Sequence, residues 1–451
     1  MKKVICFSIS FFVLVSIAFP QQINVVSSYG VINQDVGFDQ IKAGRMIVKA
    51  ARAKEHLTLL NLRYDLSKKC APDVFMSGGK PIPTGPTAIL QGISWADLDK
   101  LKPEQISAKD LFPYKPLPFV DQAEGGMLFP PMIINLLPRL VRFDLDFDLP
   151  NHILPDSAPP IYLTTRPDLG DVAKGRLITI DNYFEIFNGI LNPKQLEGLR
   201  LLVTQFPQQQ FNATDDRRTE RPSLGVTCFD CHANGHTNGA THLVGDIRPQ
   251  EFRHRIETPS LRGVNVQRLF GSQRALKTVE DFTEFEQRGA YFDGDHAMAA
   301  KKGVNVLDRG SQVHFMAEFL AILDFPPAPG LNIYGELDKT KASPAALQGE
   351  ILFNGKGLCY KCHPAPYYTD NSMHDLKAER FYRQEMANGM MMAHDGMIKT
   401  FPLRGIKDSP PYLHDGRCFT LEDVVEYFNL IQQLHLTVQE KSNLVSFLRV
   451  L

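Results

Sequence analysis

The chain has 451 residues, with 49 Lys and Arg against 50 Asp and Glu, and hydrophobic and charged contents of 43% and 22%. These proportions are those of a globular protein, and the length predicts two or three domains with cores of their own. The near-zero net charge offers no concentrated basic face, which argues against a nucleic-acid binder and a polybasic membrane-surface protein.

The N-terminus has the pattern of an export signal. Lys2 and Lys3 precede an apolar stretch that ends near Pro20 and carries Ser16-Ile17-Ala18, a small-x-small pattern typical of signal-peptide cleavage. A membrane anchor is the alternative, but the stretch is short and nothing later approaches a spanning length. We therefore expect residues 1–20 to be a signal peptide and the mature chain to be periplasmic, with no membrane span.

Residues 21–169 form an N-terminal region whose role the sequence does not indicate. A helix is expected near 41–62, followed by Pro-rich, irregular structure. Residues 142–150 alternate Phe and Leu with Asp, which predicts a half-buried strand. A calcium loop, the alternative for this stretch, would need a Gly near Leu149 and a later Glu.

Four of the seven cysteines fall into two Cys-x-x-Cys-His motifs, at 228–232 and 359–363. Two thiols at this spacing can form thioethers with one porphyrin, and the next residue can bind its iron. A thioredoxin-like dithiol and half of a zinc site are the alternatives, but neither requires the following His. We expect two covalently bound c-type haems, held by Cys228, Cys231, His232, Cys359, Cys362 and His363, with the two histidines as iron ligands. Cys6 leaves with the signal, and Cys70 and Cys418 can form a disulfide or stay free.

Helix signals surround both motifs. Before the first, a helix is expected at about 193–203, and Val313 to Leu320 mark a later one. Around the second, Ser343-Pro344 begins a helix, and Thr437 with Glu440 forms a capping box for a helix that runs to the last residue. The fold is therefore predicted as mainly α, with cytochrome c-like domains at 170–328 and 343–451 and a linker at 329–342.

An internal repeat supports this division. The segment 258–264 matches 400–406, and each copy precedes a capped helix that begins after Thr278 or Thr420. The copies are offset by one residue between Arg274 and Thr278. The two haem domains are therefore expected to be duplicates.

The tandem motifs, the repeat and the segment Pro410 to Arg417 resemble the bacterial di-haem cytochrome c peroxidase superfamily, which includes the enzyme that matures the methylamine dehydrogenase cofactor. The resemblance covers roughly residues 170–451. It implies that hydrogen peroxide reacts at the first haem and that the second relays electrons. It also implies a calcium ion between the domains, held by Glu257 and the carbonyls of Ser409 and Pro411; the alternative for Glu257 is a surface charge.

The sequence departs from that family at several positions. The Trp between the haems is replaced near Phe270, the distal Gln maps onto Phe282 or Asp281, and the distal Glu maps near Asp293. At the second haem the distal ligand maps onto Phe428, with Tyr427 as a ligand only if the alignment shifts by one. Glu286 shares a helix face with Val279 and Phe282, which makes it a candidate base for peroxide deprotonation; the alternative is a solvated side chain beside Glu284.

Other side chains near the motifs are candidate sixth ligands, although each fits packing or solvation better. They are His236, His242, His254, Met386, Met390, Met391, Met392, His394 and Met397. His414 is expected to be structural or near a propionate.

The sequence therefore predicts an exported di-haem oxidoreductase, with Glu286 or Asp293 as the base. Expected partners are hydrogen peroxide and a small electron donor such as a monohaem cytochrome or cupredoxin, and a homodimer is possible in this family. Two alternatives stay open. One is a non-catalytic electron carrier with six-coordinate irons, and the other is an oxidase or oxygenase with Phe282 and Phe428 in an apolar distal pocket.

Overall fold

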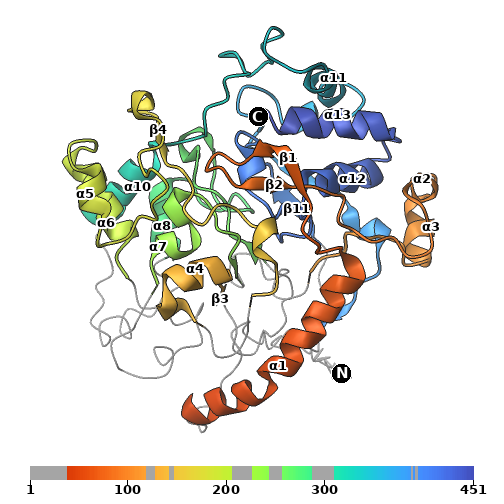
Figure 1. Cartoon of the computed structure of the whole chain (residues 1–451), viewed down its shortest axis with the longest axis horizontal. Coiled ribbons are helices and arrows are strands. Elements are labelled where there is room, and N and C mark those ends of the chain that lie inside the picture. The colour runs from red at the N-terminus through yellow and green to blue at the C-terminus, as the bar shows by residue number, and fades with distance from the viewer. Residues whose placement is uncertain are drawn as a thin grey trace, which may run out of the picture.

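The structure is a computed structural model that describes residues 38–117, 127–141, 147–205, 226–242, 256–286, 309–387, 390–391 and 395–451. Helices dominate the described residues, and every sheet has only two or three short strands. Figure 1 shows two groups of helices on opposite sides of the molecule, with α1 projecting from the body. A mainly α fold agrees with the sequence prediction, whereas the domain limits stay predictions. No helix in this part of the chain is long and apolar enough to cross a membrane.

The first helical group follows the N-terminal region in the chain. Its elements are α5 (Tyr183–Phe187), α6 (Pro193–Leu202), α7 (Cys228–Cys231), β5 (Thr241–His242), β6 (Ile256–Glu257), α8 (Val279–Phe285), α10 (His314–Leu320) and β7 (Leu323–Asp324). A π-helical turn at Arg309–Val313 leads into α10. The helices expected at 193–203 and from Val313 to Leu320 are confirmed to within a residue at their ends.

The second helical group is formed by the C-terminal part of the chain. Its elements are α11 (Pro344–Phe353), β8 (Met373–Asp375), β9 (Met386–Ala387), β10 (Met390–Met391), β11 (Met397–Lys399), α12 (Leu421–Ile431) and α13 (Val438–Leu448). The expected caps are present, because Ser343, Thr420 and Thr437 each accept a backbone hydrogen bond at the start of a helix. The last helix ends at Leu448, three residues earlier than expected.

In each group the helix before the motif packs against a later helix, α6 against α10 and α11 against α13. Both crossings are made at a glycine in the same place, five residues after the N-terminal proline. A Cβ on Gly198 would overlap the carbonyl oxygen of Phe315, and one on Gly349 would overlap that of Asn443. Only glycine therefore allows the two backbones to approach this closely.

The N-terminal region contains α1 (Phe38–Arg63), where a helix was expected, and a series of short elements. These are β1 (Cys70–Phe75), β2 (Pro81–Pro83), α2 (Trp95–Leu98), α3 (Pro103–Ala108), β3 (Met127–Leu128), α4 (Pro131–Leu136) and β4 (Tyr162–Leu163). The strand expected at 142–150 is wrong for the described residues 147–150, which form no strand. Phe147 and Leu149 are nevertheless buried, so the alternation correctly indicated burial without indicating pairing.

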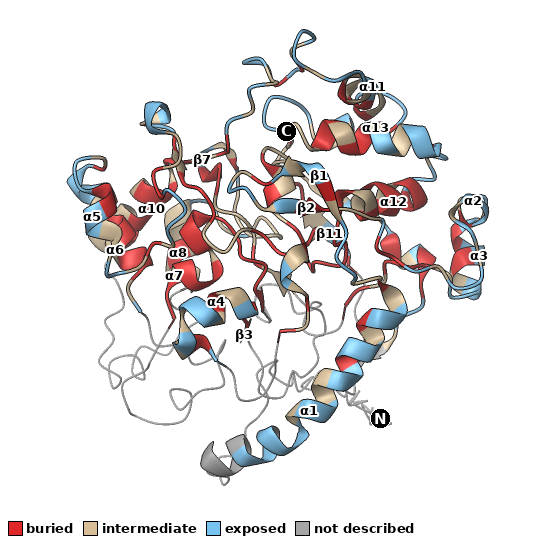
Figure 2. Ribbon diagram, viewed as in Figure 1, coloured by how far each residue is buried: buried red, intermediate tan, exposed pale blue. Residues whose placement is uncertain are grey.

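The N-terminal region packs into both helical groups. Leu60, Tyr64, Phe112 and Tyr114 belong to the same hydrophobic core as α11, α12 and α13, while Phe129 and Leu140 join the core around the first motif. Strands β3, β5 and β6 form one sheet, and β4 pairs with β7. Figure 2 shows α7 and much of α10 and α12 buried, in contrast to the largely exposed α1.

Candidate haem-binding site

The first motif forms the short helix α7, which is buried and tied to the N-terminal region. Thr227 caps the helix by accepting the N–H of Asp230 over 3.1 Å. The Asp230 side chain is 2% exposed and forms a bidentate ion pair with Arg139, with two N···O distances of 2.7 Å. Since a buried carboxylate is stable only when paired, Arg139 is part of the support of this motif.

The second motif lies at the surface, unlike the first. Cys359–Lys361 form one 3₁₀ turn that Leu358 enters with a left-handed φ of 57°. Tyr360 is 42% exposed, whereas Phe229 at the corresponding place of the first motif is 3% exposed. The two attachment sites therefore differ in their access to solvent and to other proteins.

Both motif histidines are oriented by a backbone carbonyl. The Nδ1 of His232 donates to the carbonyl oxygen of Pro259 over 2.9 Å, and that of His363 donates to Tyr368 over 2.8 Å. These bonds fix the tautomer in which Nε2 carries a lone pair, the form that binds a metal. Burial also lowers the pKa of each histidine to about 4, which favours the neutral ring.

The cysteine pairs fit thioether formation in their spacing, and none of the six described cysteines forms a disulfide. Burial raises the pKa of Cys231 well above its usual value, and nearby Asp230, Cys228 and Glu286 raise it further. Cys418 is fully buried and forms no disulfide with Cys70. The residues present therefore fit two covalently attached haems, and the free-thiol alternative holds for Cys70 and Cys418 in this structure.

Helix α8 carries the candidate peroxide base. Thr278 and Asp281 form the expected capping box, and Phe282 and Glu286 are half-buried. The charge of Glu286 contributes to the raised pKa of Cys231. Asp293 lies outside the described residues. Glu286 as the base stays a prediction.

The corresponding helix of the second copy, α12, places its two candidate ligands differently. Tyr427 is 2% exposed and packs against Phe112 and Tyr114 at ring-centroid distances of 6.2 and 6.1 Å. Phe428 is half-buried on the same side as Val424. The ring of Tyr427 thus belongs to the core shared with the N-terminal region, which leaves Phe428 as the side chain expected to contact a porphyrin.

His236 has no nitrogen available to bind iron. Its Nε2 donates to the carbonyl oxygen of Asp408 over 2.9 Å, and its Nδ1 accepts from the hydroxyl of Ser260 over 2.8 Å. Met386, Met390 and Met391 lie in the hairpin of β9 and β10, and Met397 begins β11. His254, Met392 and His394 lie outside the described residues. The ring of His414 approaches Asp395 at 3.7 Å.

The expected calcium ligands lie where the two copies of the repeat meet. Glu257 is half-buried, and its Oε1 accepts from the hydroxyl of Thr237 over 2.7 Å. Burial raises the pKa of Glu257 well above its usual value, and no described cationic side chain counteracts this. Gly416, in the loop that follows Pro411, lies beside Glu257. A Cβ built on Gly416 would be 3.7 Å from the Cβ of Glu257. The described residues contain no group of three or more His, Cys, Asp and Glu that could hold a metal ion, so carbonyl oxygens would have to complete this site.

The two copies of the repeat are in register, with each residue matching the one 142 positions later, as Thr400 follows Thr258. Phe270 bridges to Leu276 as Tyr412 bridges to Cys418, closing loops of equal length. Left-handed Arg274 therefore corresponds to left-handed Gly416. The one-residue offset expected between Arg274 and Thr278 is wrong, because the sequences of these loops differ while their backbone turns agree.

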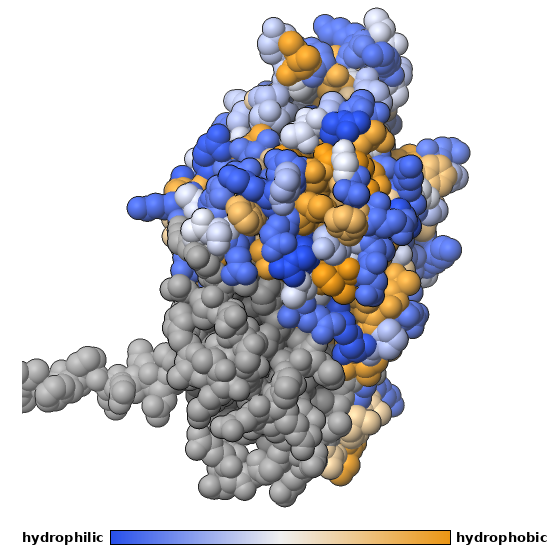
Figure 3. Space-filling model, turned by 90° about the vertical axis from the view of Figure 1, so that its left-hand side faces the viewer, coloured by the Kyte–Doolittle hydropathy of each residue, from blue (hydrophilic) through white to orange (hydrophobic). Residues whose placement is uncertain are grey.

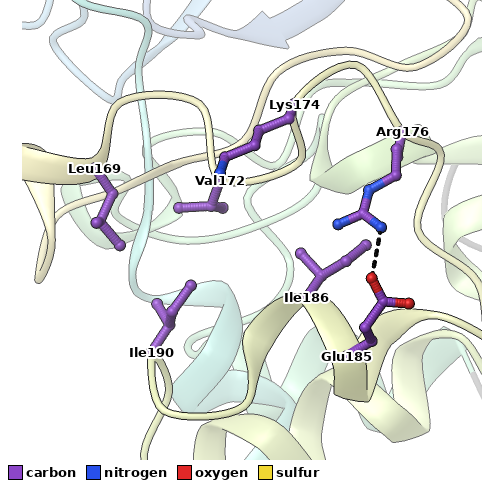
Figure 4. A pocket seen from close by; sticks show the side chains of 7 residues that line it. All are labelled: Leu169, Val172, Lys174, Arg176, Glu185, Ile186 and Ile190. Carbon is purple, nitrogen blue, oxygen red and sulfur yellow. Dashed lines mark hydrogen bonds and ion pairs between the residues drawn. The ribbon is translucent and has the colours of Figure 1, made fainter.

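A separate cavity of about 270 Å³ lies beside α5. Its lining is apolar apart from Lys174 and an ion pair between Arg176 and Glu185 at 2.9 Å (Figure 4). It includes no residue of either motif. Figure 3 presents this side of the molecule and shows apolar patches scattered among hydrophilic residues in its coloured part.

Comparisons with known proteins find similarity to haem proteins, in agreement with the two motifs. The chain is 28% identical over 173 residues to a cytochrome-c peroxidase, IdrP2, of Pseudomonas sp. strain SCT, covering 30% of this chain and 47% of the relative. It is 30% identical over 128 residues to the methylamine utilization protein MauG of Methylorubrum extorquens, covering 25% and 36%. The cytochrome c551 peroxidase of Nitrosomonas europaea is 33% identical over 132 residues, with 28% and 39% covered.

Over part of its length, the chain is similar in sequence to cytochrome c peroxidases and to MauG. It spans less than half the length of these three relatives, and no family model matches it. Among solved structures it is similar to a MauG-like protein associated with microbial copper homeostasis, with a TM-score of 0.41, 18% identity, and 58% of this chain and 88% of that one covered. It is also similar to the di-haem peroxidase BthA of Burkholderia thailandensis, with a TM-score of 0.36, 14% identity, and 66% and 94% covered.

Sequence reasoning predicted the haem-attachment residues and missed the contacts that hold them in place. Arg139 and Asp230, the bonds of His236 and the crossing glycines depend on contacts between distant segments. A signal existed for the glycines, since each follows a helix-initiating proline by five residues in both copies.

Proposed function

We propose that this protein is an exported di-haem c-type cytochrome that reduces hydrogen peroxide at the first motif with electrons received through the second. The observation that carries the proposal is the paired orientation of His232 and His363, each fixed by a carbonyl so that Nε2 is available for iron. Haem bound at each motif would supply a redox-active iron. Similarity to cytochrome c peroxidases and MauG supports the same conclusion.

The difference in exposure between the two motifs supports different roles for them, with electrons entering at the second motif and peroxide reacting at the first. Tyr360 and Lys361, within the second motif, are exposed, so a small donor such as a monohaem cytochrome or cupredoxin can approach closely there. The first motif is buried, and the charge of Glu286 acts on the pKa of its Cys231. A buried site excludes water and competing reactants, which suits the step that consumes peroxide.

The chain's own groups would manage the protons of the reaction. Reduction of hydrogen peroxide to two waters consumes two electrons and two protons, and the donor supplies the electrons. Glu286 would accept the first proton from peroxide at a carboxylate oxygen and return it to the leaving oxygen. Phe282, half-buried on the same helix, would stand where the family has an amide, so this site would rely on one carboxylate.

The test is to purify the protein from a periplasmic expression host and measure haem by pyridine haemochrome and intact mass. Two haems per chain are expected, with one lost in Cys228→Ser/Cys231→Ser and one lost in Cys359→Ser/Cys362→Ser. Peroxide should oxidise the reduced wild-type protein, and the variant that lacks the first haem should lose this reaction while its remaining haem is still reduced by a donor cytochrome.

A single haem in the wild-type protein would refute the proposal. Two haems that do not react with peroxide would favour the electron carrier, and oxygen consumption without added peroxide would favour the oxidase.

A further inference from the structure

The two copies of the repeat meet through reciprocal backbone contacts. The N–H of Glu257 donates to the carbonyl of His414 over 2.9 Å, and the N–H of Lys399 donates to the carbonyl of Ser272 over 2.9 Å. Lys399 follows Glu257 by 142 positions, and His414 follows Ser272 by the same number. Each copy therefore uses the same strand residue to bind the same loop residue of the other copy, as in a two-fold interface.

The corresponding side chains have opposite charges. Glu257 brings a half-buried carboxylate with a hydroxyl partner, Thr237. Lys399 brings a buried ammonium group, 3% exposed, whose Nζ donates to the Oε1 of Gln267 over 2.8 Å. The ammonium also lies 5.7 Å from the ring centroid of Phe270 and 5.1 Å from that of Phe401, within cation–π range.

The surroundings of the two side chains also correspond. Gln267 stands 142 positions before Ser409, and Leu269 stands 142 positions before Pro411, so they occupy the places of the expected calcium ligands. Arg274 stands in the place of Gly416. A Cβ added to Gly416 would lie 3.7 Å from the Cβ of Glu257, and the charge of Arg274 lowers the pKa of Lys399.

The absence of a counter-charge makes Lys399 unusual. It forms no ion pair within the described part of the chain, and burial together with Arg274 lowers its pKa to about 8. A buried ammonium without a carboxylate is costly unless oxygen atoms and ring faces replace its hydration. Gln267, Phe270 and Phe401 provide those replacements, so the site around Lys399 is built to hold a positive charge.

We propose that the ammonium group of Lys399 is the built-in counterpart of a divalent cation at Glu257. The interface between the repeats then contains two equivalent sites, each with a positive charge. One binds a hard cation such as calcium through the Glu257 carboxylate and carbonyl oxygens, and the other is filled by the chain itself. The Glu257 half of this inference rests on the calcium site expected from the family, whereas the Lys399 half stands on the contacts above.

The test converts the site around Lys399 into a copy of the site around Glu257. The transfer variant Lys399→Glu/Arg274→Gly gives the site around Lys399 the Glu and the Gly that Glu257 and Gly416 provide at the other site, and glycine suits the φ of 54° at position 274. Calcium stoichiometry is measured by calorimetry, and by terbium luminescence, on holoprotein with both haems. We expect one ion per wild-type chain, two for the transfer variant, none for Glu257→Gln, and one for the exposed control Lys194→Glu.

A folded transfer variant with no additional ion would overturn the inference about Lys399 and leave the calcium site intact. If the wild-type protein binds no ion and the transfer variant binds one, the calcium site at Glu257 fails while the inference about Lys399 stands. If neither protein binds an ion, both fail.

Two further variants decide the matter if the transfer variant does not fold. Lys399→Met should lower the unfolding temperature, because the Oε1 of Gln267 loses its hydrogen-bond donor. This loss should outweigh the gain from removing a buried charge that has no carboxylate partner. Glu257→Lys should make the unfolding temperature insensitive to calcium and to chelator, and higher than that of Glu257→Gln in chelator. A rise in stability for Lys399→Met, or a Glu257→Lys protein no more stable than Glu257→Gln, would refute the proposal.

Discussion

At the scale of single residues, the same residue type can have opposite roles a few positions apart. His232 is half-buried and bonds through one ring nitrogen, whereas His236 is buried and bonds through both. The Cys-x-x-Cys-His spacing predicts an iron-binding role for His232. Nothing in the local sequence distinguishes His236 from a candidate ligand, because Ser260 and Asp408 reach it from distant parts of the chain.

The bonds of His236 predict a pH dependence of stability. Burial and the charge of Arg262 lower the pKa of His236 well below its usual 6.5, so the folded state favours the neutral ring. His236 therefore contributes fully to the free energy of unfolding above about pH 6.5. This contribution is lost as the pH falls, at up to about 1.4 kcal/mol per pH unit. Denaturant unfolding of His236→Gln should show a flatter decline between pH 6.5 and 5 than the wild-type protein. An equal slope in the two proteins would assign the decline to other groups.

Glu286 provides a second prediction at this scale. If its carboxylate is the peroxide base, Glu286→Gln should keep both haems and their reduction by a donor, yet react with peroxide about 10²-fold more slowly, the scale of a lost general base. The matched control is Glu284→Gln, two residues earlier at the end of α8, which should react at the wild-type rate. An unchanged rate in Glu286→Gln would leave Asp293, or no protein base, for this step.

At the scale of elements, the sequence predicted how helices begin better than how strands pair. The capping boxes at Thr278, Thr420 and Thr437 are local patterns, and the structure confirms all three. In residues 147–150 the alternating Phe and Leu are buried, but the segment pairs with no strand. Pairing needs a partner strand, which no local pattern specifies. The close helix crossings depend on a partner helix that is distant in the sequence, since Gly198 meets Phe315 and Gly349 meets Asn443.

The glycine crossings give a prediction for these elements. Gly349→Ala should destabilise the protein by about 1–3 kcal/mol, because the added methyl group forces α11 away from α13, and this exceeds the gain of up to about 1 kcal/mol in helix propensity. Gly198→Ala should do the same to α6 and α10. Chemical denaturation followed at the haem bands measures the loss. Gly44→Ala, within α1, is the control, because a Cβ added there meets no atom within 4 Å; equal losses at 349 and 44 would mean that the crossing is not the cause.

At the scale of the whole molecule, the N-terminal region is an integral part of the fold, and this could not be read from its Pro-rich sequence. Its attachment to the second helical group depends on Asp423, which is fully buried. The Asp423 carboxylate accepts the N–H groups of Thr87 and Ala88 and the hydroxyls of Thr87 and Tyr114. In the first copy the same place is taken by Asp281, which is half-buried and accepts the N–H groups of Lys277 and Thr278.

This difference allows the contribution of the N-terminal region to be measured with two matched substitutions. Asp281→Ala removes the acceptor of a helix cap and should cost about 1 kcal/mol. Asp423→Ala removes the equivalent cap and also leaves the buried donors of residues 87, 88 and 114 without an acceptor, so it should cost about 3 kcal/mol or more. Limited proteolysis should then cleave Asp423→Ala between residues 84 and 117, where the wild-type protein and Asp281→Ala resist. Equal losses of stability in the two variants, with no new cleavage, would show that contacts other than those of Asp423 hold the N-terminal region, because the cap is then the only interaction that the two aspartates contribute.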